Sequence, residues 1–257
     1  MSGSRSAAPE AGVRDGATDG ARTMSAAGVD VPILALDEAT AALVEATAAI
    51  AACDEETMRR ALRLAHERAP AEWVEEVILQ SYLFAGLPRA LNAMRLWRSV
   101  SGVGAPDADA ERDSGEQEWL ERGEATCAVV YGPFYESLRL NIAALHPAFD
   151  RWMVTEGYGK VLGRPALDLR RRELCVMAAC AAAQQDRQLH SHLHGALHVG
   201  ATAAEVEEAL AIALRTAAPV LAPDAPRRYA QLWGKVAGKH DAAGAAGARS
   251  ATNDGGS

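Results

Sequence analysis

Residues 171–200 read RRELCVMAACAAAQQDRQLHSHLHGALHVG, and this stretch decides the fold that we predict. An alanine-rich run follows Glu173, a polar break at Gln184, Gln185 and Asp186 interrupts it, and a second run holds four of the seven histidines. Alanine and leucine are strong helix formers, and the apolar residues of both runs recur at helical spacing. We therefore predict a helical hairpin that carries the chemistry of the chain.

The composition of the whole chain also favours helices. Alanine is abundant, aromatic residues make up only 5% of the chain, and alternating runs of β-branched residues are few. The spacing and the composition together predict an all-α protein. A length of 257 residues allows one large domain or two small ones.

The charge and the cysteine content limit which classes of partner the protein can bind and in which cellular compartment we expect it. The net charge of −8 and the pI near 5.4 argue against nucleic acids and anionic membranes, which require a basic surface. No stretch of about 18 apolar residues indicates a membrane span, and no signal peptide is recognisable. The four cysteines form no C-x-x-C pair, so we expect buried free thiols. These features predict a soluble cytoplasmic protein that binds a small molecule.

Composition also divides the chain into segments. Polar or Gly/Ala/Ser-rich stretches without apolar periodicity lie at both ends and in the middle. We predict a disordered tail at 1–30, a first repeat at 31–100, a linker at 101–117, a helical lead-in with a second repeat at 118–237, and a disordered tail at 238–257.

The two predicted repeats share sequence features at a constant offset. LDEATAAL at 36–43 parallels LDLRRREL at 167–174, an offset of 131, and APAEWVEE at 69–76 parallels ATAAEVEE at 201–208, an offset of 132. Such self-similarity indicates tandem copies. We predict three helices in each copy, with Asp37 among the residues that cap them.

A helical wheel separates His192 from the other histidines of the hairpin. Leu189, Leu193 and Ala196 form an apolar stripe, and His192 lies about 60° from Leu189 at its border. A half-buried imidazole can have its pKa tuned for proton transfer. The alternative is a structural histidine that is hydrogen-bonded to a neighbouring helix.

His190 and His194 have the i, i+4 spacing of a metal pair, but no third ligand accompanies them at a typical spacing. We expect them on a solvated face and predict no metal. Glu173 stands in the first turn of its helix, where a carboxylate favours the helix dipole. The functional alternative is that the hairpin brings Glu173 to His192, where a carboxylate would fix the imidazole tautomer.

Several of these residues resemble the carboxymuconolactone decarboxylase-like superfamily, which also contains the alkyl hydroperoxidase D-like proteins. The run GYGKVLGRPALD at 157–168 is similar to the approach to its core, and the core positions that match include Arg172, Glu173, Leu174 and His192. The resemblance covers about 155–215 well and 36–97 more weakly. In the peroxidase branch it implies two cysteines, where this chain has Gln185 and Gln188. Without a thiolate, a cysteine-dependent peroxidase is disfavoured.

What the resemblance implies is a cofactor-free lyase or isomerase of the decarboxylase branch, acting on a small carboxylated, lactone-type metabolite. His192 would move the proton and Glu173 would orient it. The expected substrate-binding residues are Arg164, Gln185, Gln188 and Tyr158.

The alternative is a non-catalytic ligand-binding or scaffold member of the superfamily, because the first copy has Ala42 and Ala61 in place of the polar pair. The first copy does keep the aromatic-Gly-Pro segment at 82–88, so one site per chain could be lined by both copies. Members of the superfamily assemble into rings, which implies a homo-oligomer. A trimer of two-copy chains would give a ring of six copies.

Overall fold

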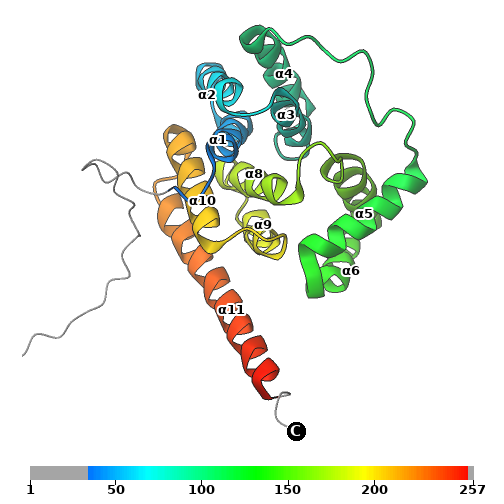
Figure 1. Cartoon of the computed structure of the whole chain (residues 1–257), viewed down its shortest axis with the longest axis vertical. Coiled ribbons are helices and arrows are strands. Elements are labelled where there is room, and N and C mark those ends of the chain that lie inside the picture. Colours follow the sequence, from blue (N-terminus) through cyan, green and yellow to red (C-terminus); the bar gives the residue numbers. More distant parts are fainter. Residues whose placement is uncertain (1–33, 254–257) are drawn as a thin grey trace, which may run out of the picture. The chain divides into compact units, whose positions relative to one another are not determined.

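The computed structural model describes the backbone of residues 34–253 and the side chains of residues 34–240. Within that range all regular structure is helical and no strand occurs (Figure 1). The all-α prediction is confirmed. The tail predicted at 1–30 lies outside the described residues. None of the described helices is long and apolar enough to cross a membrane.

The first group of helices contains one more helix than the sequence predicts. It consists of α1 (Glu38–Ala52), α2 (Glu55–Arg68), α3 (Ala71–Ala85) and α4 (Leu87–Ser101). Asp37 and Asp54 cap α1 and α2, since their side chains accept hydrogen bonds from the backbone N–H groups of Thr40 (2.8 Å) and Thr57 (2.9 Å). The extra helix, α4, follows the Gly86 break and has a proline in its first turn, a favourable position for proline.

The second group repeats the helix boundaries of the first. It consists of α8 (Leu169–Ala182), α9 (Asp186–His198), α10 (Ala203–Ala217), the short η3 (Ala218–Val220) and α11 (Ala225–Asn253). The starts of α8, α9 and α10 follow those of α1, α2 and α3 by 131, 131 and 132 residues. Asp168 caps α8, and Thr202 with Glu205 forms a capping box on α10.

One boundary differs from the sequence-based expectation. Helix α11 continues to Asn253, so the backbone of 238–253 is helical where the sequence analysis expects a disordered tail. Alanine recurs through this segment, and its high helix propensity outweighs the interspersed glycines.

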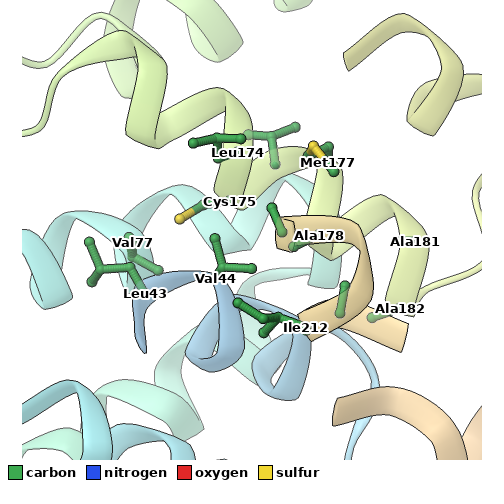
Figure 2. Close-up of a cluster of buried hydrophobic side chains, with 14 of the residues drawn as sticks. Leu43, Val44, Val77, Leu174, Cys175, Met177, Ala178, Ala181, Ala182 and Ile212 are labelled. Atoms are coloured by element: carbon green, nitrogen blue, oxygen red, sulfur yellow. The ribbon is translucent and has the colours of Figure 1, made fainter. Parts of the chain in front are cut away.

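Helices α1 and α8 pack against each other at the centre of the core, and both are buried along most of their length. Figure 2 shows Cys175 of α8 pointing toward Leu43 and Val44 of α1, with Ile212 of α10 beside Val44. Alanines at the remaining contact positions allow close helix packing. All four cysteines are buried and free, as predicted.

The helices of the lead-in lie between the two groups in sequence. They are α5 (Glu116–Tyr131), η1 (Gly132–Phe134), α6 (Tyr135–Leu145), α7 (Pro147–Trp152) and η2 (Met153–Leu162), which is a π-helix. Backbones of α5 and η2 touch: a Cβ at Gly159 would lie 1.8 Å from the carbonyl oxygen of Trp119. Only glycine fits there. This contact sets Tyr158 of η2 beside Tyr131 at the end of α5.

Candidate functional site

The hairpin of α8 and α9 brings Glu173 and His192 into direct contact. Its turn contains Gln184 in the left-handed region (φ 57°), and the Gln184 carboxamide oxygen accepts a hydrogen bond from the Ala222 N–H (3.0 Å). Across the hairpin, Oε2 of Glu173 lies 2.8 Å from Nδ1 of His192. Glu173 is fully buried and His192 is 6% exposed. The predicted pair therefore forms.

Gly195 makes the approach of Glu173 possible. It lies one turn after His192 on α9, and a Cβ added there would stand 2.6 Å from Oε2 of Glu173 and 2.8 Å from a methyl carbon of Val130. Both distances are shorter than a van der Waals contact allows. The carboxylate thus occupies space that any larger residue at 195 would fill.

Aromatic side chains from two other parts of the chain enclose His192. The ring of Phe84, from α3, meets the imidazole edge to face at 5.9 Å between centroids, and the ring of Tyr131 lies at 6.4 Å. Tyr158 donates a hydrogen bond to the Tyr131 hydroxyl (3.1 Å). Burial, followed by the charge of Glu173, raises the pKa of Tyr131, and burial also raises the pKa of Tyr158. Both phenols remain protonated at neutral pH.

The geometry leaves two polar atoms for chemistry. When Glu173 is ionised, it accepts a hydrogen bond from Nδ1–H of His192, so Nε2 keeps its lone pair and can act as a base. The second carboxylate oxygen, Oε1, is buried and has no hydrogen-bond partner among the described residues. A buried acceptor without a partner is costly, so Oε1 is ready to bind a donor.

Comparison with known proteins identifies the segment that carries this pair. Residues 147–231 match the family model described as "Carboxymuconolactone decarboxylase family". The chain is also similar to "Peroxisomal protein 2" of Schizosaccharomyces pombe, which is 28% identical over 147 residues, or 55% of this chain and 67% of that protein. The carboxymuconolactone decarboxylase segment contains both Glu173 and His192, whereas Phe84 and Tyr131 lie outside it.

The structure does not bring all of the predicted substrate-binding residues to the pair. Tyr158 is connected to it through Tyr131. Arg164 instead forms ion pairs with Glu76 (2.9 Å) and Asp109 (3.1 Å), so its guanidinium already has carboxylate partners.

Gln185 and Gln188 are exposed at the start of α9, and the Gln185 carboxamide bonds to the Ala183 carbonyl at 3.2 Å. Neither glutamine forms a hydrogen bond to the buried pair. The amides that replace the cysteines of the peroxidase branch are therefore at the solvent-facing entrance of the hairpin.

Arg172 is a buried residue whose role the sequence does not reveal. Its guanidinium donates to Glu76 (2.7 Å), to Gln80 (3.1 Å) and to the carbonyl groups of Leu167 and Arg164. These bonds tie α8 to α3 and to the loop before α8. Arg172 thus holds in place the helix that carries Glu173. The run of three arginines conceals which one is buried.

His190 and His194 are partly exposed on α9, where they line a cavity together with Phe134. Within the described part of the chain, no group of three or more His, Cys, Asp or Glu residues is arranged to hold a metal ion.

Proposed function

We propose that this protein is a cofactor-free lyase or isomerase that acts on a small carboxylated, lactone-type metabolite by proton transfer at His192. The observation that carries the proposal is the buried contact of 2.8 Å between Glu173 and His192. A carboxylate beside an imidazole fixes its tautomer and raises its basicity, which general acid–base catalysis needs. The match of residues 147–231 to the decarboxylase family model agrees with this chemistry.

In this proposal His192 touches the reacting carbon and Glu173 is its positioning residue. During decarboxylation, the bond to the carboxylate carbon breaks and its electron pair stays on the carbon next to the lactone carbonyl. The imidazolium of His192 delivers a proton to that carbon as CO2 leaves. During isomerisation, neutral His192 removes a proton from one carbon and returns it to another. The Tyr131 hydroxyl would donate to the developing oxyanion.

A cysteine-dependent peroxidase is the less suitable reaction for this chain. Burial raises the pKa of both Cys127 and Cys175 to about 12, so neither forms a thiolate at neutral pH. The hairpin positions that hold cysteines in the peroxidase branch hold Gln185 and Gln188. Thiolate chemistry would need a low pKa and solvent access.

The test is turnover of a panel of lactone carboxylates by the full chain and by His192→Gln. We expect a loss of about 10²- to 10⁴-fold in kcat/KM, the usual contribution of a general acid or base. The control is His66→Gln, because His66 is an exposed histidine on α2. Equal rates for His192→Gln and the unchanged protein would contradict the proposal. Saturable binding of a panel member without turnover would favour the rival reading, a non-catalytic binding protein.

We further propose that the protein self-associates, with a trimer as the expected state. Support comes from large apolar side chains that are more than half exposed on α5, η1, α6 and α7: Val129, Phe134, Leu140, Leu145, Phe149 and Trp152. Clusters of exposed apolar residues mark interaction surfaces. We expect light scattering to give an oligomeric mass for the unchanged protein. The mass should be lower for the double variant Leu140→Asp/Leu145→Asp. A monomeric mass for the unchanged protein would contradict this.

Two other expectations remain proposals. The helix offsets of 131, 131 and 132 residues support the origin of residues 31–100 and of the second repeat within 118–237 from two copies of one helical unit. The four free cysteines support a reducing compartment, which we propose is the cytoplasm. Cell fractionation tests the second proposal, and recovery of the protein inside a membrane-bound compartment would contradict it.

A further inference from the structure

A cavity lies along the face of α9 that carries His190, His194 and His198. Its volume is about 250 Å³. Helices α5, α6, α9 and α11 and the short η1 contribute its walls, and the lining residues are Val130, Tyr131, Phe134, Ser137, Leu138, Asn141, His190, Ser191, His194, His198 and Lys239. We call it the histidine cavity. The proposed reaction does not use its histidines or Lys239, although Tyr131 both lines it and lies beside His192.

The charge of the histidine cavity is opposite to that of the protein. The whole chain has a net charge of −8, yet the cavity is lined by three histidines and Lys239 and by no carboxylate. His190 and His194 stack at 5.0 Å between ring centroids, and His194 and His198 lie at 6.4 Å. The His198 Nδ1–H donates to the Val130 carbonyl (2.8 Å), which fixes that ring. The Lys239 ammonium and the N–H groups of the imidazoles can donate hydrogen bonds to a negatively charged ligand.

The protonation behaviour of the histidines agrees with this geometry. Burial lowers the pKa of His194 to about 4, and the neighbouring His190, His198, Lys239 and His240 contribute in the same direction. The pKa of His190 is also lowered, by burial and then by Lys239 and Lys235. His190 and His194 are therefore neutral at neutral pH, and Lys239 carries the positive charge of the cavity. An anion bound among them would favour the protonated imidazoles and raise these pKa values.

The other wall of the histidine cavity is apolar and aromatic. Phe134 faces His194 at 6.4 Å between ring centroids, and Leu138, Val130 and Tyr131 complete this side. At about 30 Å³ for each water-sized group, the volume holds roughly eight such groups. A flat organic molecule of that size would lie on the aromatic wall while its charged end meets the basic side chains.

We propose that the histidine cavity binds a small organic carboxylate, with the carboxylate among His190, His194 and Lys239 and the apolar body against Phe134 and Leu138. The shared wall at Tyr131 places this ligand next to the Glu173–His192 pair. Binding does not require turnover at His192, so this inference goes beyond the proposed reaction and can be tested separately from it.

Calorimetric titration of the full chain with benzoate, benzamide and inorganic phosphate tests the proposal. Benzoate has the charge and the flat apolar body, benzamide has the body alone, and phosphate has the charge alone. We expect benzoate to bind with a dissociation constant in the millimolar range or tighter, and at least about tenfold more tightly than either other probe. Absence of saturable benzoate binding, or equal binding of benzamide, would overturn the proposal. Equal binding of phosphate would show an inorganic anion site instead and would also overturn it.

Matched variants locate the binding. Lys239 is exposed, so Lys239→Gln removes a charge from the cavity without affecting the core. We expect benzoate to bind about tenfold more weakly to Lys239→Gln and to His194→Gln. Lys160→Gln is the control, because it removes the same charge from η2, where Lys160 pairs with Glu156. Unchanged affinity in both cavity variants would show that benzoate binds elsewhere.

A last variant separates this inference from the proposed reaction. His192 does not line the histidine cavity. His192→Gln is therefore expected to bind benzoate within about twofold of the unchanged protein, even where it has lost turnover. A benzoate affinity that disappears in His192→Gln but persists in Lys239→Gln and His194→Gln would assign the ligand to the catalytic pair and would overturn the separate site.

Discussion

The hairpin of α1 and α2 and the hairpin of α8 and α9 share their helix boundaries but not their buried polar residues. Where the second hairpin has Glu173 and His192, the first has Ala42 and Ala61, and all four side chains are buried. The first hairpin shows that the fold packs without a polar pair. Burial of a carboxylate and an imidazole loses their hydration, which their mutual attraction offsets only in part. The pair is therefore better explained by chemistry than by stability.

Two further positions differ between the hairpins in a way that matches this difference. Gly195 corresponds to Leu64, and the buried Arg172 corresponds to Ala41. Leucine at 64 faces an alanine-lined hairpin, whereas glycine at 195 leaves room for a carboxylate. Arg172 has carboxylate and carbonyl partners on α3 and the preceding loop. Adjacent residues of α8 thus have separate roles: Arg172 fixes the helix to its neighbours, and Glu173 contacts His192.

The largest expected effect comes from making the second hairpin resemble the first. In Glu173→Ala/His192→Ala both polar groups leave together, so no unpaired buried charge remains. We expect kcat/KM for the substrate to fall about 10²- to 10⁴-fold. We also expect the far-UV circular dichroism to remain helical. Loss of helicity at room temperature would show that the pair maintains the fold, contrary to the comparison of the hairpins.

The next largest effect concerns the buried ion pair between Arg172 and Glu76, which holds α8 against α3. Glu76→Ala leaves Arg172 as a buried charge without its carboxylate, and we expect a loss of about 3–5 kcal/mol in the free energy of unfolding. Denaturant titration measures it. Glu55→Ala is the control, because the pair of Glu55 with Arg59 is on the surface and contributes at most about 1 kcal/mol. Equal losses of unfolding free energy in the two variants would show that the buried Arg172–Glu76 pair contributes no more to stability than a surface pair.

A smaller effect is expected at the close approach of α9 to Glu173. Gly195→Ala inserts a methyl group against the carboxylate and Val130, and we expect it to lower the free energy of unfolding by about 1–3 kcal/mol. The loss should shrink by at least about 0.5 kcal/mol in the Glu173→Ala background, since the two sites are in contact. Gly234→Ala provides the control, because nothing lies within 4 Å of its added Cβ. Equal losses in both backgrounds would disprove the coupling.

The smallest effect tests what the hairpins have in common. Asp37→Ala and Asp168→Ala each remove a helix cap, and we expect each to cost about 1 kcal/mol. Burial tends to raise the pKa of both carboxyl groups, but their hydrogen bonds and Arg171 outweigh it and lower each below 3.8. The capping contribution is therefore complete above that value and is lost as the pH falls through the lowered pKa. Acid titrations of stability should show the variants losing less than the unchanged protein. A loss of stability in only one of the two variants would show that the two Asp caps are not equivalent.

Local sequence signals predicted the hairpins well because helical periodicity and capping depend on residues within a few positions of one another. The Asp caps, the apolar stripe of α9 and the contact of Glu173 with His192 all follow from such signals and from the family resemblance. The roles of Arg164 and Phe84 depend on contacts between distant segments. Arg164 pairs with Glu76, 88 residues away, and no periodicity in the sequence indicates that contact.

The same reason applies to the other histidines of α9. A helical wheel puts His190 and His194 on the polar face of α9. The wheel does not show that Phe134 and Lys239, from separate helical segments, line a cavity with them. Likewise, the glycine contact between α5 and η2 that sets Tyr158 beside Tyr131 is visible only in three dimensions.

The space at Gly195 also restricts the order in which substitutions can accumulate during evolution. While Glu173 is present, a larger residue at 195 is selected against, so the carboxylate must be lost before the glycine. After the glycine is replaced, restoring Glu173 alone would create a clash, and the lost pair cannot return by single tolerated steps. The first hairpin has Leu64 at the position of Gly195 and Ala42 at that of Glu173, the combination that such a loss would leave. Loss of the site is thus easily reached and hard to reverse, which predicts that descendants of this fold that discard the pair acquire new roles elsewhere on the surface.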